Sequence, residues 1–140
     1  MRQIVRSWIE TRPTDLSGWL AAVTDPQIGT ALARIHRDPG NAWTVDTLAA
    51  AAGMSRSLFA ERFMTLLTVS SARYLLQWRM RLSAVWLRTE DMPVAEVASR
   101  LGYASDAAFS RAFKRFFGSS PKSLRGESRR PQMRGKADPP

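Results

Sequence analysis

The chain has 140 residues, the length of one domain or of a small domain with extensions. It contains no cysteine and one histidine, His36, which excludes disulfides, thiol catalysis, thiolate metal sites and multi-histidine metal sites. The formal net charge is +9, and residues 111–136 carry nine basic groups against one acidic group. Such a block is either a solvated tail or a footprint for phosphate. The second interpretation fits residues 111–125 better, because their charges interleave with a helical apolar stripe.

The predicted elements are all helices, since no alternating β-branched run bounded by turn residues is present. One or two short helices are expected at the start, at Ile4–Glu10 and Leu16–Val23, with a break at Arg12-Pro13-Thr14. A third begins at Asp25 and Pro26, because aspartate is a favoured N-cap and proline fits the first helical position. It is expected to end before Asp38.

Two helices separated by a glycine come next. Thr44 is expected to cap Val45–Ala52, and Ser55 to cap a helix that runs to about Leu67. Gly53 lies between them, where a tight turn requires a backbone conformation that a residue with a Cβ adopts only at a cost.

A long helix is predicted over Ser71–Thr89. Its large apolar residues recur at spacings of three, four, seven and eight, which indicates one buried face. That face is expected to hold the helices before and after it rigidly. It consists of Tyr74, Leu75, Trp78, Leu82, Val85 and Trp86.

The pattern of a short helix, a glycine and a longer helix then recurs. Pro93 sets the first turn of Val94–Leu101, and Ser105 caps a helix that runs to about Phe117. Gly118 ends that helix.

The end of the chain contains one more short helix, from Pro121 to about Arg125. From Gly126 onward the chain is rich in Arg, Pro, Gly and Lys and has almost no apolar residue. We expect residues 127–140 to form a disordered basic tail.

The two glycine-containing segments are copies of one another. They are offset by 49 residues before the turn and by 50 after it, so the second copy carries an additional turn residue, Ala104. Each copy has the residue pattern of a helix-turn-helix unit. The first copy comprises Val45, Leu48, Ala49, Ala52, Gly53, Met54, Ser55, Phe59, Phe63 and Leu67, and the second comprises Val94, Val97, Ala98, Leu101, Gly102, Tyr103, Ser105, Phe109, Phe113 and Phe117.

The longer helix of the second copy has two distinct faces. The apolar one is expected to be core and consists of Ala108, Phe109, Ala112, Phe113 and Phe116. In a helix-turn-helix, the opposite face enters the DNA major groove with its amino-terminal end first. Here that face consists of Ala107, Ser110, Arg111 and Lys114, with Asp106 at the helix start.

Residues 27–125, about 99 of the 140, resemble the DNA-binding domain of the AraC/XylS family of bacterial transcription regulators. The resemblance is strongest in the second copy, and Arg79-Met80 is similar to the family's connector helix. The other residues that carry it are Ala49, Gly53-Met54-Ser55-Arg56-Ser57, Pro93 through Ala98, Gly102-Tyr103, Phe109 through Arg115 and Gly118 through Pro121.

The chain departs from the family pattern at a few positions. The family usually has glycine and proline where this chain has Thr68 and Ser71, and often tyrosine where it has Leu124. The longer helix of each copy is the recognition helix. On that of the first copy the family often places longer hydrogen-bond donors, where this chain offers Ser57, Ala60 and Glu61.

The resemblance implies an all-α fold with two helix-turn-helix units joined by a long connector helix. Residues 1–25 would be a linker or the tail of an effector-binding or dimerising domain outside this chain, and 127–140 the basic tail. The DNA-binding domain would span residues 26–126, with helix-turn-helix units at 44–67 and 93–118 and the connector at 71–89.

The resemblance also implies that a monomer places its two recognition helices in successive major grooves of double-stranded DNA. The base-facing candidates are Ser57, Ala60, Glu61, Asp106, Ala107, Ser110 and Arg111. The phosphate-binding candidates flank the recognition helices and are Arg56, Arg81, Lys114, Arg115, Lys122 and Arg125.

No cofactor, metal or catalytic group is expected, because the carboxylates are scattered over helix surfaces and no nucleophile–base pair is visible. RNA polymerase is the expected protein partner and the cytoplasm the expected location, without membrane association or a small-molecule effector on this chain. Two alternatives stay open. The first alternative is a non-specific nucleic-acid binder, and the second is a helical protein-interaction module. Binding assays at several salt concentrations separate both from a sequence-specific DNA-binding protein.

Overall fold

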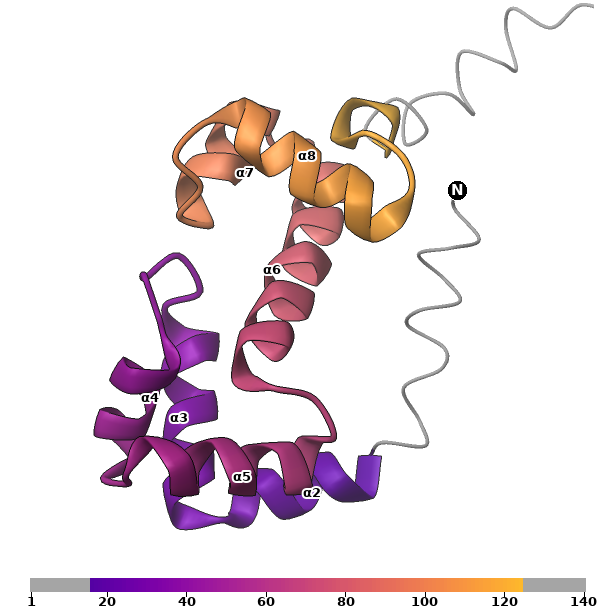
Figure 1. Cartoon of the computed structure of the whole chain (residues 1–140). Helices are drawn as coiled ribbons and strands as arrows, with labels where there is room; N and C mark the ends of the chain where they lie inside the picture. The colour runs from indigo at the N-terminus through magenta and orange to yellow at the C-terminus, as the bar shows by residue number, and fades with distance from the viewer. Residues whose placement is uncertain (1–15, 125–140) are drawn as a thin grey trace, which may run out of the picture. The chain divides into compact units, whose positions relative to one another are not determined.

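The computed structural model describes residues 16–124, with side chains from Leu20 onward, and every regular element there is a helix (Figure 1). The predicted helix Ile4–Glu10, the tail 127–140 and Arg125 lie outside the described residues. Residues 121–124 are helical, as expected. The longer helices are α2 (Leu16–Thr24), α3 (Pro26–Arg37), α4 (Val45–Ala52), α5 (Arg56–Leu67), α6 (Ser71–Arg88), α7 (Val94–Arg100) and α8 (Asp106–Phe117).

The chain divides into two compact units, and the division falls within α6, between Arg79 and Met80. The amino-terminal unit, as described, contains α2 to α5 and the first half of α6. The carboxy-terminal unit contains the second half of α6, α7, α8 and residues 121–124.

The helix starts follow from local side-chain chemistry. Asp25 caps α3, since its carboxylate accepts hydrogen bonds from the backbone N–H groups of Gln27 and Ile28 at 3.0 and 2.9 Å. Thr44 and Thr47 form a reciprocal capping box at α4, in which each backbone N–H donates to the other residue's hydroxyl oxygen. These caps explain why the predicted starts of α3 and α4 are confirmed.

The core of the amino-terminal unit is built from one face of each helix. Its aromatic centre is Phe63, whose ring centroid lies 5.6 Å from that of Phe59 and 5.8 Å from that of Tyr74. Burial of each large apolar side chain contributes on the order of 1.5–3 kcal/mol. The buried residues are Ala22, Ile28, Ala31, Leu32, Ile35, Leu48, Ala49, Ala52, Phe59, Phe63, Tyr74 and Leu75.

Helix α2 is packed into this unit against α3 and α5. Ala22 is fully buried, and the backbone of α3 approaches the end of α2 so closely that a Cβ on Gly29 would lie 2.6 Å from the carbonyl oxygen of Val23. Residues 16–24, expected to belong to a linker or to the tail of a preceding domain, therefore form a helix that contributes to the core.

The first half of α6 is held to α3 and to the loop after it. His36 Nε2 lies 2.7 Å from the hydroxyl of Tyr74, and the ring centroid of His36 lies 4.4 Å from that of Trp78. Partial burial lowers the pKa of His36 below its usual value of 6.5. Arg79 donates from Nε to the carbonyl oxygen of Pro39 and from Nη2 to that of Asn41, at 2.8 and 2.9 Å.

The core of the carboxy-terminal unit is an aromatic row along α8. Ring centroids are 5.7 Å apart between Phe109 and Phe113 and 4.7 Å apart between Phe113 and Phe117. Phe116, predicted to be core, is half-buried, and Phe117 is buried in its place. Both positions lie about one turn after Phe113, so periodicity alone does not choose between them.

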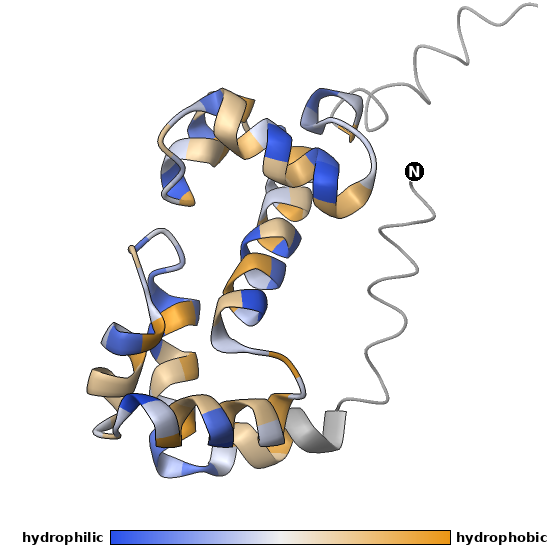
Figure 2. Cartoon of the chain, viewed as in Figure 1, coloured by the Kyte–Doolittle hydropathy of each residue, from blue (hydrophilic) through white to orange (hydrophobic). Residues whose placement is uncertain are grey.

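The single buried stripe predicted along α6 is only partly correct. Tyr74 and Leu75 are buried, but Trp78, Leu82 and Trp86 are half-buried and Val85 is 46% exposed. Each half of the helix packs into a different unit, so the two halves need not bury the same stripe, and hydrophobic and hydrophilic positions follow one another along α6 (Figure 2). The buried positions of the second half are Met80, Ser83, Ala84 and Leu87.

Candidate nucleic-acid interface

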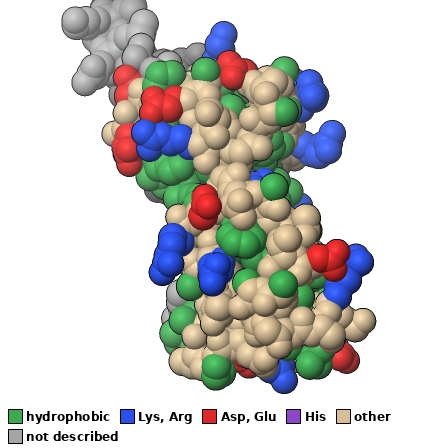
Figure 3. Space-filling view, turned by 90° about the vertical axis from the view of Figure 1, so that its left-hand side faces the viewer, with side chains coloured by type: hydrophobic (Ala, Val, Ile, Leu, Met, Phe, Trp, Pro, Cys, Tyr) green, Lys and Arg blue, Asp and Glu red, His purple; other side chains and the backbone are tan. Residues whose placement is uncertain are grey.

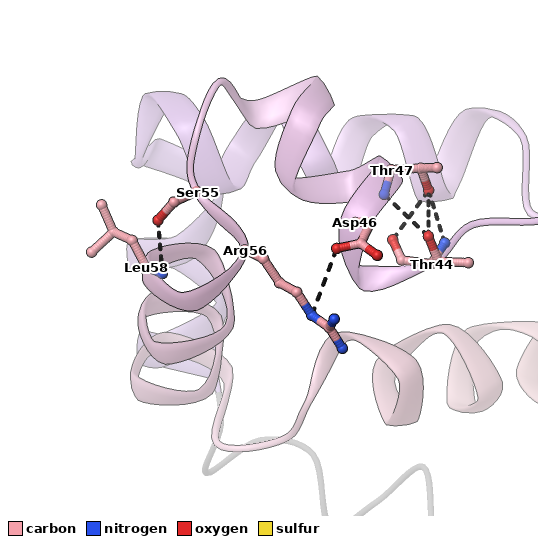
Figure 4. Close-up of polar contacts among 6 residues, drawn as sticks. All are labelled: Thr44, Asp46, Thr47, Ser55, Arg56 and Leu58. Carbon is pink, nitrogen blue, oxygen red and sulfur yellow. Dashed lines mark hydrogen bonds and ion pairs between the residues drawn. The ribbon is translucent and has the colours of Figure 1, made fainter.

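The turn between α4 and α5 is set by one left-handed residue. Gly53 has φ 71° and ψ 34°, a region in which residues with a Cβ are strained. The N–H of Met54 donates to the carbonyl oxygen of Ala49 at 2.9 Å, which closes the end of α4. Ser55 then starts α5 by accepting a hydrogen bond from the N–H of Leu58 at 3.2 Å (Figure 4).

The turn between α7 and α8 repeats this geometry. Gly102 has φ 80°, and the N–H of Tyr103 donates to the carbonyl oxygen of Ala98 at 3.0 Å. Ser105 caps α8 by accepting from the N–H of Ala108 at 3.0 Å. The sequence repeat is thus a structural repeat, in which a short helix, a left-handed glycine and a serine-capped longer helix occur once in each unit.

The predicted base-facing residues of α5 share one exposed face. Ser57, Ala60 and Glu61 are all exposed, and Phe59 and Phe63 on the other side are fully buried. The structure therefore brings these three residues together on the surface, as expected from their spacing.

The predicted base-facing residues of α8 are arranged in the same way. Asp106, Ala107 and Arg111 are exposed and Ser110 is half-buried, on the side away from the buried phenylalanines. Within residues 16–124, Arg111 forms no ion pair. Its guanidinium keeps its hydrogen-bond donors available to a partner.

The phosphate-binding candidates are more varied. Lys114, Arg115 and Lys122 are exposed, but Arg81 is half-buried and already interacts within the protein. Arg125 lies outside the described residues. The face drawn in Figure 3 carries basic and acidic side chains interspersed, so the overall charge of +9 does not make every surface basic.

Arg56 has an acidic neighbour that the sequence analysis missed. Its Nε lies 3.6 Å from Oδ1 of Asp46 in the first turn of α4, and both side chains are 68% exposed (Figure 4). The two residues are ten positions apart and belong to different helices, so no helical spacing rule indicated the pair.

Two large apolar side chains of α5 were also missed. Leu58 and Met64 are 45% and 47% exposed. Met64 follows Ser57 by seven residues, which places it on the Ser57–Glu61 face, and this spacing was the signal available in the sequence.

Other kinds of site have little support in the part of the chain that the structure describes. There, no three His, Asp or Glu side chains are grouped so as to hold a metal ion. None of the described helices is both long and apolar enough to cross a membrane.

Comparison with known proteins identifies the family. Residues 48–127 match the family model for a helix-turn-helix domain. The chain is 43% identical to an AraC-like transcription regulator of Streptomyces antibioticus, over 87% of this chain and 40% of that protein. It is 42% identical to the regulator AlkR of Acinetobacter baylyi, over 81% of this chain and 37% of that protein.

A solved structure gives the same result. The DNA-binding domain of AdpA, determined in complex with a target DNA, superimposes with a TM-score of 0.69 at 35% identity, over 78% of this chain and 99% of that domain. The chain belongs to the AraC-like family of helix-turn-helix transcription regulators. The predicted all-α fold and family are confirmed. The chain spans about 40% of the length of the Streptomyces relatives that it matches.

Proposed function

We propose that this chain binds double-stranded DNA in a sequence-specific manner, as the DNA-binding part of a transcription regulator. The observation that carries the proposal is the structural repeat, which exposes one face of α5 in one unit and one face of α8 in the other. In helix-turn-helix proteins the second helix lies in the major groove. Family membership and the DNA-bound AdpA domain support the same function.

The two recognition helices would occupy successive major grooves. In α8 the base-facing residues would be Asp106, Ala107, Ser110 and Arg111. Arg111 is the strongest candidate for direct readout, because an arginine side chain pairs with both O6 and N7 of guanine.

Phosphate contacts would come from cations beside the recognition helices. Lys114 and Arg115 follow Arg111 along α8 and are both exposed. Arg56, Lys122 and Arg125 are weaker candidates, as is Arg81, which already interacts within the protein. Each true phosphate ligand contributes about one unit to the dependence of log affinity on log salt concentration.

The finer parts of the proposal concern partners. A DNA-bound regulator of this kind would act on RNA polymerase in the cytoplasm, and this chain would contribute no catalysis. No small-molecule effector would bind within it, and calorimetry that detects tight metabolite binding to this chain alone would contradict that statement.

Selection of bound duplexes from a random DNA pool tests the proposal. A sequence-specific binder enriches a defined motif that is long enough to span two major grooves. A non-specific binder retains DNA without enriching any motif. A protein-interaction module shows no salt-dependent binding of DNA.

A further inference from the structure

The exposed face of α5 has a different chemistry from that of α8. It consists of a hydroxyl at Ser57, a methyl at Ala60, a carboxylate at Glu61 and a thioether at Met64, all exposed. A helix turns by about 100° per residue, so Met64 lies within about 20° of Ser57 around the helix axis. Leu58, similarly exposed, is about 100° away and lies on the flank of this face.

Each arginine of α5 has an acidic neighbour that offsets its positive charge beside this face. Arg62 donates from Nη1 to Oε1 of Gln27 at 3.0 Å and lies 3.7 Å from the carboxylate of Asp25, so it is directed toward α3. Arg56 is the first residue of the helix and lies beside Asp46. In contrast, α8 exposes Arg111, Lys114 and Arg115.

The bases differ in what they offer to such a face in the major groove. Guanine presents only acceptors, N7 and O6, which repel a carboxylate, and adenine combines a donor with the acceptor N7. Cytosine presents the N4 amino group as a donor, and thymine presents the acceptor O4 beside its C5 methyl group, which makes apolar contacts. A face with one carboxylate and two apolar side chains therefore matches pyrimidines better than purines.

We propose that α5 reads a pyrimidine-rich strand, in which Glu61 accepts a hydrogen bond from a cytosine N4 amino group and Met64, with Ala60, packs on a thymine methyl group. This inference rests on the proposed DNA-binding function and adds the base class that the first unit selects. Met64 reaches the groove from the third turn of α5, because its unbranched side chain has three rotatable bonds and adapts to an irregular surface.

The methyl contact is tested by replacing thymines with deoxyuridine, which removes only the C5 methyl group. Each thymine of the duplex selected by the wild-type protein is replaced in turn. Affinity is then measured for the wild-type chain, Met64→Ala and Leu58→Ala. We expect at least one replacement that weakens wild-type binding roughly fourfold, as for the loss of one buried methyl group. That replacement should have no effect on Met64→Ala and its full effect on Leu58→Ala.

The carboxylate contact is tested with Glu61→Gln. Glutamine pairs with N6 and N7 of adenine, so the variant should change its preference from cytosine to adenine at one position of the site. Positions read by α8 should keep their preference, which provides an internal control for folding.

The outcomes separate this inference from the function on which it rests. If the wild-type chain enriches no motif, the proposed function fails. If a motif is enriched but no thymine replacement depends on Met64 and Glu61→Gln changes no base preference, pyrimidine readout by α5 is wrong. That result would leave the face of α5 as a surface for a protein partner.

Discussion

Replacement of Arg111 by alanine should separate readout from folding. Arg111 is exposed and, within residues 16–124, forms no ion pair, so its loss should change the free energy of unfolding by less than about 0.5 kcal/mol. A bidentate contact with guanine contributes about 1–3 kcal/mol of discrimination, which corresponds to a roughly 5- to 150-fold loss of affinity. The loss should be confined to the preferred site and should relax the choice of base at one position.

The assay is titration of labelled duplexes that carry each of the four base pairs at every position of the preferred site. Lys114→Ala is the matched control, because Lys114 is also exposed on α8 and lies one turn further on. It should weaken binding to all duplexes alike and reduce the salt slope by about one unit. If Arg111→Ala gives that uniform pattern instead, Arg111 binds phosphate and the assignment of readout to α8 is refuted.

Three further substitutions have distinct expected outcomes. Thr68 caps the end of α5 with φ 63°, and Thr68→Gly should stabilise the protein by about 0.5–1 kcal/mol, since relief of left-handed strain exceeds the entropic cost of glycine. Chemical denaturation checks this, with Thr68→Ala as a control that keeps a Cβ at positive φ and should gain less stability than Thr68→Gly. Gly29→Ala should destabilise by about 1–3 kcal/mol, because its Cβ would lie 2.6 Å from a backbone oxygen; an unchanged denaturation midpoint would contradict the close packing of α2 on α3. Asp46→Asn should strengthen binding to all DNA sequences a few-fold at low salt, since it frees Arg56 and removes a negative charge near phosphate. Weaker binding would instead show that Asp46 positions Arg56 for its contact with a DNA phosphate.

The features that the sequence predicted well are those with local causes. The starts of α3, α5 and α8 depend on one capping side chain each, the start of α4 depends on the Thr44–Thr47 capping box, and both turns depend on a glycine with positive φ. These signals lie within a few residues of the structure that they determine. The exposed faces of α5 and α8 were predictable for a related reason, because helical spacing separates them from buried phenylalanines.

The features that escaped prediction depend on tertiary packing. The periodicity of α6 indicated one stripe through Val85 and Trp86, whereas the second half of the helix buries Met80 and Leu87. Apolar residues occupy both sets of positions, so only the packing of each unit decides which set is buried. The Asp46–Arg56 pair likewise joins two helices whose approach depends on the turn at Gly53.

The ratio of affinities for the selected duplex and for bulk DNA tests the central claim most directly. It is measured by competition at several salt concentrations with the whole chain. Sequence-specific readout by two recognition helices predicts a selected site bound at least about a thousandfold more tightly than bulk DNA, with both affinities falling as salt rises. Equal affinity for selected and bulk DNA, or binding that does not respond to salt, would contradict the account.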